Sequence, residues 1–324
     1  MFDLCVPLAQ LDTTHALFGL AAAATAAMFW AGATVMYRRI GRVLPPVRMN
    51  LTKNLLATVL LCVVVGGAWA LSPDRGQPFT LARPMMLLLI LSGIVGIGIG
   101  DTCFFAALAR IGARRTLLLF MLAPVATAAL AWPILAETIG PWQTAGIAIT
   151  VAGIAWVIAE RNHATSDGHV DALGICFAAG AALCQAGGAL MTRYVFDHGD
   201  IAAAPSAIVR ITAGSAILLL MLPLDKLLPQ PGGAAENHPK RPSIKHTFFL
   251  VAVAATMGSF LGIWLQQVAF KSDANVGVAQ TLLSTSPLFV LPIVLLLGER
   301  VSRRAAIGAA VSIVGVALLF IASG

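Results

Sequence analysis

The sequence predicts an all-α membrane protein in which ten transmembrane helices form two inverted five-helix repeats. Hydrophobic residues make up 59% of the 324 residues and charged residues only 11%, and the mean hydropathy is +0.89. Apolar runs long enough to cross a bilayer recur along the whole chain. This composition excludes a disordered chain, a disulfide-stapled secreted domain and a nucleic-acid-binding domain, which all need more polar or cysteine-rich sequence.

Each expected helix is a run of about 20 apolar residues bounded by charged residues, Pro or Gly. Residues Phe248 to Phe270 stay apolar on every face, which favours helices over the alternating strands of a membrane barrel. The connection 225–246 is rich in Pro, Gly and charged residues, and it is expected to be a flexible surface loop. The expected spans are 15–36, 47–70, 85–108, 116–135, 142–159, 172–195, 205–224, 247–270, 276–297 and 305–322.

The loop charges predict the orientation. Of the 21 Lys and Arg residues, sixteen fall on one side of the ten expected spans and four on the other, while Arg210 lies inside a span. Positively charged loops tend to stay in the cytoplasm. Both termini are therefore predicted to be non-cytoplasmic.

The second half of the chain repeats the first. Gly96, Gly100, Ala107, Glu137, Gly146 and Gly153 recur 162 positions later as Gly258, Gly262, Ala269, Glu299, Gly308 and Gly315. Pro124 corresponds to Pro287 at an offset of 163. The repeats are expected at 15–160 and 171–322. Because five spans are an odd number, the second repeat is inverted, an arrangement typical of alternating-access transporters. Channels and membrane scaffolds also contain repeats, so symmetry names no substrate.

Several segments are similar to one known family. They are Phe29 to Gly32, Pro45-Pro46, Gly98 to Leu108, Leu265 to Ala269, Ala279 to Pro287, and the paired Glu137/Gly146 and Glu299/Gly308. In these the chain resembles the EamA-domain proteins of the drug/metabolite transporter superfamily. The resemblance implies a ten-helix, exporter-like permease of the bacterial inner membrane that moves a small metabolite.

The chain departs from this family in two respects. Members are commonly drawn with both termini in the cytoplasm, whereas the loop charges here predict the opposite. At the position of Asn50 the family often has an Arg, which the second repeat retains as Arg210.

The first repeat places three polar groups at matched depths. Asp101 is the only acidic residue well inside a span, and Lys53 and Asn50 enter the neighbouring span from the same side. An unpaired charge would cost several kcal/mol at this depth, so Asp101 is expected to face Lys53 and Asn50. The pair acts either as structural glue or in coupling transport to protons or substrate, and the sequence leaves both open.

The second repeat offers a cation and two amides. Arg210 lies near Gln266 and Gln267, a group that suits a substrate carboxylate. Alternatively, Arg210 snorkels to the headgroups.

The ninth expected span has a polar face, where Gln280 and Ser284 are expected to line a cavity. Pro124 and Pro287 are expected to kink their helices. Trp30 and Trp264 are candidates for the cavity wall, although aromatic residues in spans more often pack or anchor.

Glu137 and Glu299 are interpreted as caps of the helices that follow them. The chain has no HExxH, GxSxG or Walker motif, and its cysteines form no CxxC. No catalytic residue, metal site or cofactor is therefore predicted. The expected partners are a small-molecule substrate and the lipid bilayer, without nucleic acid.

Overall fold

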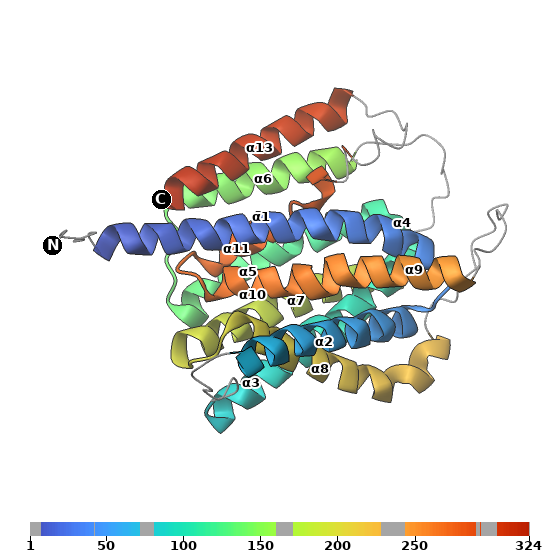
Figure 1. Ribbon diagram of the computed structural model, residues 1–324. Helices are drawn as coiled ribbons and strands as arrows, with labels where there is room; N and C mark the ends of the chain where they lie inside the picture. The colour runs from blue at the N-terminus through green and yellow to red at the C-terminus, as the bar shows by residue number, and fades with distance from the viewer. Residues whose placement is uncertain are drawn as a thin grey trace.

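The computed structural model describes residues 8–41, 43–71, 81–159, 171–227, 244–289, 292 and 303–323, and these residues contain no strand. Figure 1 shows the helices running side by side as one bundle. In chain order they are α1 (Leu8–Ile40), α2 (Pro46–Leu71), α3 (Arg83–Gly93), the π-helix η1 (Ile94–Gly100), α4 (Asp101–Phe120), α5 (Leu122–Leu135), α6 (Pro141–Ala159), α7 (Ala172–His198), α8 (Ala203–Met221), the 3₁₀-helix η2 (Leu222–Leu227), α9 (Ile244–Ala254), the π-helix η3 (Ala255–Gly262), α10 (Ile263–Lys271), α11 (Val276–Leu283) and α13 (Arg303–Ser323).

Helix occupies each of the ten expected segments as far as the structure describes them. Six helices in the described residues are long and apolar enough to cross a membrane by themselves: His15–Tyr37, Pro46–Leu71, Arg83–Ile111, Ala172–His198, Ala203–Met221 and Thr247–Lys271. Leu122–Leu135 and Ala306–Ala322 are shorter apolar helices. The all-helical membrane fold is confirmed, and the full count of ten spans stays a prediction.

The chain reverses within the range labelled α4. The rings of Phe104 and Phe120 lie 5.0 Å apart between centroids, whereas sixteen residues of straight helix would separate them by about 24 Å. The third and fourth expected spans are therefore two antiparallel segments, although the residues between them are also helical.

The expected loop 225–246 is shorter than predicted. Residues 225–227 belong to η2 and 244–246 to α9, and its central part lies outside the described residues. Asp225 explains the early helical structure, because its buried carboxylate accepts a hydrogen bond from the Val47 amide and pairs with Arg48 at 3.1 Å.

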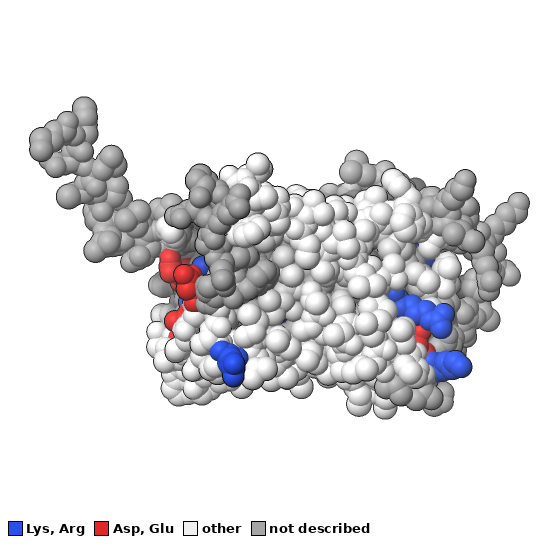
Figure 2. All heavy atoms as spheres, turned by 60° about the horizontal axis from the view of Figure 1, so that its bottom comes forward, with Lys and Arg blue, Asp and Glu red and all other residues white. Residues whose placement is uncertain are grey.

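The outer surface is apolar. Large side chains such as Leu71, Leu220 and Ile321 are at least three-quarters exposed, which suits lipid contact and not water. Figure 2 shows charged side chains toward the two ends of the visible face and an uncharged band between them. The start of α1 and the end of α13 lie at the same end of the bundle (Figure 1), as an even number of crossings requires.

The two repeats pack reciprocally. Where α6 crosses α13, a Cβ added to Gly146 would lie 3.2 Å from the Gly315 carbonyl oxygen, and one added to Gly153 would lie 2.8 Å from that of Gly308. Gly308 and Gly315 are the repeat equivalents of Gly146 and Gly153. Each glycine thus meets the equivalent of the other, as in contacts about a two-fold axis.

The π-helices follow the same symmetry. At the repeat offset of 162, residues 94–100 of η1 correspond to 256–262, and η3 spans 255–262. The segment η1 of the first repeat packs on α7 and α8 of the second, and η3 packs on α1 and α2. The halves therefore interlock, and the space between them lies at the centre of the bundle.

The close glycine crossing gives a first prediction. Gly153→Ala pushes a methyl group to within 2.7 Å of the Ser312 amide nitrogen, so the backbones must separate, at a cost of about 1–3 kcal/mol. The control is Gly180→Ala, whose methyl group meets nothing within 4 Å and which is expected to be neutral or slightly stabilising. Thermal unfolding in detergent compares the two, and equal stability would contradict the packing.

The helix count gives a second prediction. Single cysteines placed at Gly168 and Lys240 in a cysteine-free background are expected to react with an impermeant thiol reagent only from the cytoplasmic face. Labelling of the two positions from opposite faces would disprove the ten-span topology. Labelling of both from the outside would reverse the orientation and leave the count intact.

Candidate functional site

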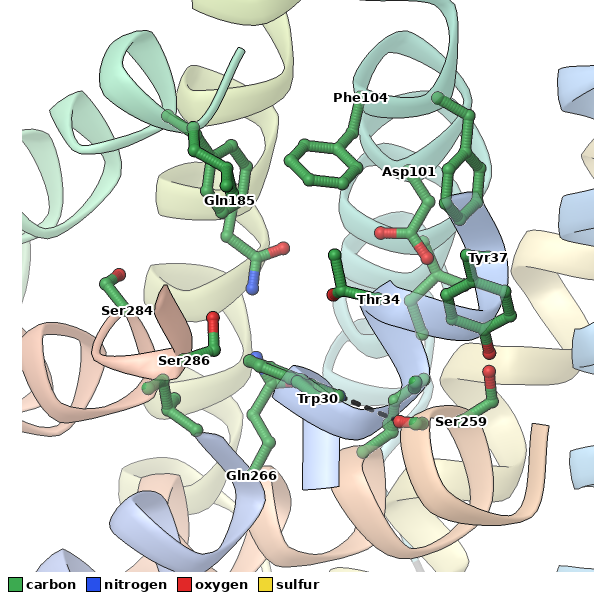
Figure 3. Close-up of a pocket in the computed structure, with 18 of the residues that line it drawn as sticks. Trp30, Thr34, Tyr37, Asp101, Phe104, Gln185, Ser259, Gln266, Ser284 and Ser286 are labelled. Atoms are coloured by element: carbon green, nitrogen blue, oxygen red, sulfur yellow. Dashed lines mark hydrogen bonds between the residues drawn. The ribbon is translucent and has the colours of Figure 1, made fainter. Parts of the chain in front are cut away.

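A cavity of about 130 Å³ lies where the two repeats meet, comparable to a cavity that holds a benzene-sized molecule. Figure 3 shows side chains from α1, α4, α7, α10 and the π-helix η3 converging on it. The first repeat contributes Trp30, Ala33, Thr34, Tyr37, Lys53, Ile97, Asp101, Phe104, Phe105, Leu117, Phe120 and Met121. The second contributes Gln185, Arg210, Gly258, Ser259, Ile263, Gln266, Gln280, Leu283, Ser284, Ser286 and Pro287.

Lys53 and Asp101 form an ion pair at the cavity, as their matched depths predict. The Lys53 Nζ lies 2.7 Å from Asp101 Oδ2, and the side chains are 4% and 31% exposed. Lys53 also donates to Asn54 Oδ1 at 3.0 Å. Asn50 lies behind the pair and donates to the carbonyl oxygen of Ile97 at 2.9 Å, so it anchors α2 to the π-helix without a hydrogen bond to Asp101.

Arg210 is fully buried, with 1% of its surface exposed, so the snorkelling interpretation is wrong. Its Nη1 donates to Gln267 Oε1 at 2.8 Å, and Gln267 donates onward to Ser206 Oγ at 2.9 Å. A Cβ added to Gly96 or Gly188 would lie 3.2 or 3.3 Å from Nη2. The two glycines therefore leave room for the guanidinium between η1 and α7.

Three buried polar atoms on cavity-lining side chains have no hydrogen-bond partner: Arg210 Nε, Gln266 Nε2 and Gln280 Oε1. Buried polar groups are usually paired, because leaving one unpaired costs about 1–3 kcal/mol. Each of these atoms is itself covered, so a ligand in the cavity would reach it after a small rotation of its side chain. Within the described part of the chain no three His, Cys, Asp or Glu side chains are grouped to hold a metal ion.

Both prolines lie just after a helix break. The element α4 ends at Phe120, four residues before Pro124, and α11 ends at Leu283, four residues before Pro287. Proline has no N–H to bond the carbonyl four residues earlier, which accounts for both breaks. Pro124 lies in the first turn of α5, and the break before it at Met121 falls within the expected span 116–135, where the kink was predicted.

Glu137 caps a different helix from the one expected. Its Oε2 accepts from the Val276 amide at 2.8 Å, at the start of α11 and not of α6, and its Oε1 lies 3.0 Å from Arg193 Nε. Burial raises the pKa of the Glu137 carboxyl and Arg193 opposes this shift. Glu137 thus joins the two repeats near one end of the bundle. Glu299 lies outside the described residues.

The expected site residues divide into three groups. Trp30, Lys53, Asp101, Arg210, Gln266, Gln280, Ser284 and Pro287 line the cavity. Asn50 and Gln267 stand behind it as hydrogen-bond supports. Trp264 packs instead against Phe260, with ring centroids 5.9 Å apart.

Sequence reasoning missed several lining residues, among them Tyr37, Phe104, Gln185 and Ser259. Gln185 had a detectable signal, because Ala31-Gly32 recurs 155 positions later as Ala186-Gly187, which makes Gln185 the counterpart of Trp30. Ser259 lies 162 positions after Ile97, and both line the cavity. The repeat offset therefore relates lining positions that side-chain polarity alone does not identify.

The ion pair gives a third prediction. Asp101→Asn leaves Lys53 charged and almost fully buried, so it is expected to destabilise the protein by about 3 kcal/mol. Lys53→Met is expected to cost less, because Asp101 retains some exposure. The double variant should recover part of the loss. Unfolding free energies of the wild type, the two single variants and the double variant form a double-mutant cycle. Strictly additive changes in these free energies would contradict a direct ion pair.

Comparison with known proteins agrees with this architecture. A solved structure described only as "Crystal structure of protein" matches with a TM-score of 0.72 at 16% identity, covering 95% of this chain and 96% of that chain. This likeness shows a shared fold. No curated protein matches the chain. The model of the EamA-like transporter family matches twice, over residues 17–159 and 172–321. These two matches cover most of the sequence, and the chain belongs to the EamA-like transporter family.

Proposed function

We propose that the protein is a secondary transporter that moves a small organic metabolite by alternating access, with its binding site in the central cavity. The observation that carries the proposal is that both repeats line this one cavity. Membership of the EamA-like family supports transport as the general activity, and the family resemblance favours export.

The packing suits this mechanism. Two similar half-bundles that meet through reciprocal contacts have two related arrangements, and exchange between them exposes a shared site first to one side and then to the other. The Glu137–Arg193 pair and the Glu137–Val276 hydrogen bond join the repeats near one end of the bundle. We propose that these contacts hold that end closed in the present arrangement.

The experiment first identifies candidate substrates and then tests their transport. Metabolite profiling compares cells that lack the protein with cells that overproduce it, and solutes whose levels change are loaded into proteoliposomes for counterflow. Saturable counterflow is expected for a carrier. Single-channel currents would instead indicate a pore, and no difference in any solute would indicate a scaffold.

A variant pair gives a fourth prediction. Ser286→Phe fills the cavity and is expected to slow counterflow by at least about tenfold, because the solute loses its space. Leu220→Phe, on an exposed apolar position of α8, is the control and is expected to transport normally. Equal counterflow by both variants would place the transport path elsewhere.

A further inference from the structure

The cavity has two chemically different walls, and the repeat offset makes the difference clear. At equivalent positions the first repeat supplies an apolar side chain and the second a polar one. Four of these pairs have an offset of 162 or 163: Ile97 and Ser259, Phe104 and Gln266, Leu117 and Gln280, and Met121 and Ser284. The fifth pair, Trp30 and Gln185, has an offset of 155, and all ten residues line the cavity. Asp101 and Ile263 reverse the pattern, and Phe120 and Leu283 are apolar in both repeats. The two repeats have therefore diverged toward opposite polarity at the shared site.

The first-repeat wall is largely aromatic. Phe104 lies in edge contact with both Phe105 and Phe120, with ring centroids 5.9 and 5.0 Å apart. The indole of Trp30 is fixed by a 2.8 Å hydrogen bond from Nε1 to the Gly258 carbonyl oxygen (Figure 3). Rigid aromatic faces of this kind favour the apolar body of a flat or compact solute.

The side chains of the second-repeat wall carry hydrogen-bonding groups that have no partner in the protein. Gln266 Nε2 and Arg210 Nε are donors left unpaired beside the cavity, on side chains that are 3% and 1% exposed. Arg210 is held in place by Gln267, so its guanidinium is oriented before a ligand arrives. Both groups are hydrogen-bond donors that need an acceptor, and a planar carboxylate matches the geometry of a guanidinium best.

The charges of the lining residues do not cancel. Among the described residues that line the cavity, Lys53 and Arg210 are cations and Asp101 is the one anion, already paired with Lys53 at 2.7 Å. The cavity therefore has a formal charge of +1 on the side of the second repeat. The partner of Arg210 is a neutral amide and not a counter-charge. A buried charge without a counter-charge is costly, and an anionic solute would offset that cost.

We propose that the site binds an organic monoanion in a fixed orientation, with its carboxylate at Arg210 and Gln266 and its apolar body against the aromatic wall of Trp30 and Phe104. A zwitterion fits less well, because the carboxylate that would receive its ammonium group is already neutralised by Lys53. This proposal rests on the proposed function, since it assigns the substrate class of the same cavity.

Three planar molecules of nearly equal size test the charge. Benzoate is an anion, benzamide is neutral and benzamidine is a cation. Added to the detergent-purified full-length protein, benzoate is expected to raise the unfolding temperature and the other two to have little effect. Phenylglycine, added in parallel, tests the zwitterion. A larger shift with benzamide, benzamidine or phenylglycine, or no shift with any of the four, would overturn the proposal.

Two adjacent glutamines provide matched variants. Gln266→Leu removes an unpaired donor, so the protein is expected to keep its stability while benzoate binds at least about tenfold more weakly. Gln267→Leu breaks two internal hydrogen bonds and is expected to lower stability. Arg210→Lys keeps the buried charge but loses the planar fork, so it should fold and respond weakly to benzoate. Unchanged benzoate affinity in both Gln266→Leu and Arg210→Lys would contradict the assignment.

The anion-site proposal and the transporter proposal can be disproved independently. Benzoate binding in detergent without counterflow of any solute would support the site and contradict the transporter proposal. Counterflow of a cationic or zwitterionic solute with no response to benzoate would support transport and contradict the anion site.

Discussion

Charged side chains inside a bilayer must find partners within the protein, and this constraint organises the centre of the bundle. Lys53 finds Asp101, and Arg210 finds Gln267. Each pair joins neighbouring helices of one repeat, and both pairs border the same cavity. The helices around them contribute mainly Ala, Gly and small polar residues to the buried interior, which permits the close approach that such pairs need.

Much of the fold follows from local sequence. Long apolar runs and their Pro boundaries place the helices, and the glycines that recur at 162 residues mark the crossing of α6 and α13. The helical structure between the third and fourth segments was not predictable in this way. The arginines between these segments predict a loop, whereas the chain turns there within residues that belong to α4.

The candidate site was predictable to a similar degree. Because ionisable groups inside membrane spans are few, the pairing of Lys53 with Asp101 could be predicted from the sequence. The grouping of Arg210 with its neighbouring glutamines could be predicted for the same reason. Glu137 shows where such reasoning ends. Its partner Val276 lies 139 positions away in the sequence, and only the tertiary packing of two helix ends brings them together. The aromatic wall was missed for a related reason, because Phe104 resembles any other apolar residue in a span until its neighbours are known.

The two proline breaks have a mechanical consequence. The carbonyls of Phe120 and Leu283 lack the amide that a regular helix would supply four residues later, and both residues border the cavity. Both helices therefore lack a backbone hydrogen bond at the depth of the cavity. A change in the shape of the cavity would therefore act directly on the two points where these helices bend most easily.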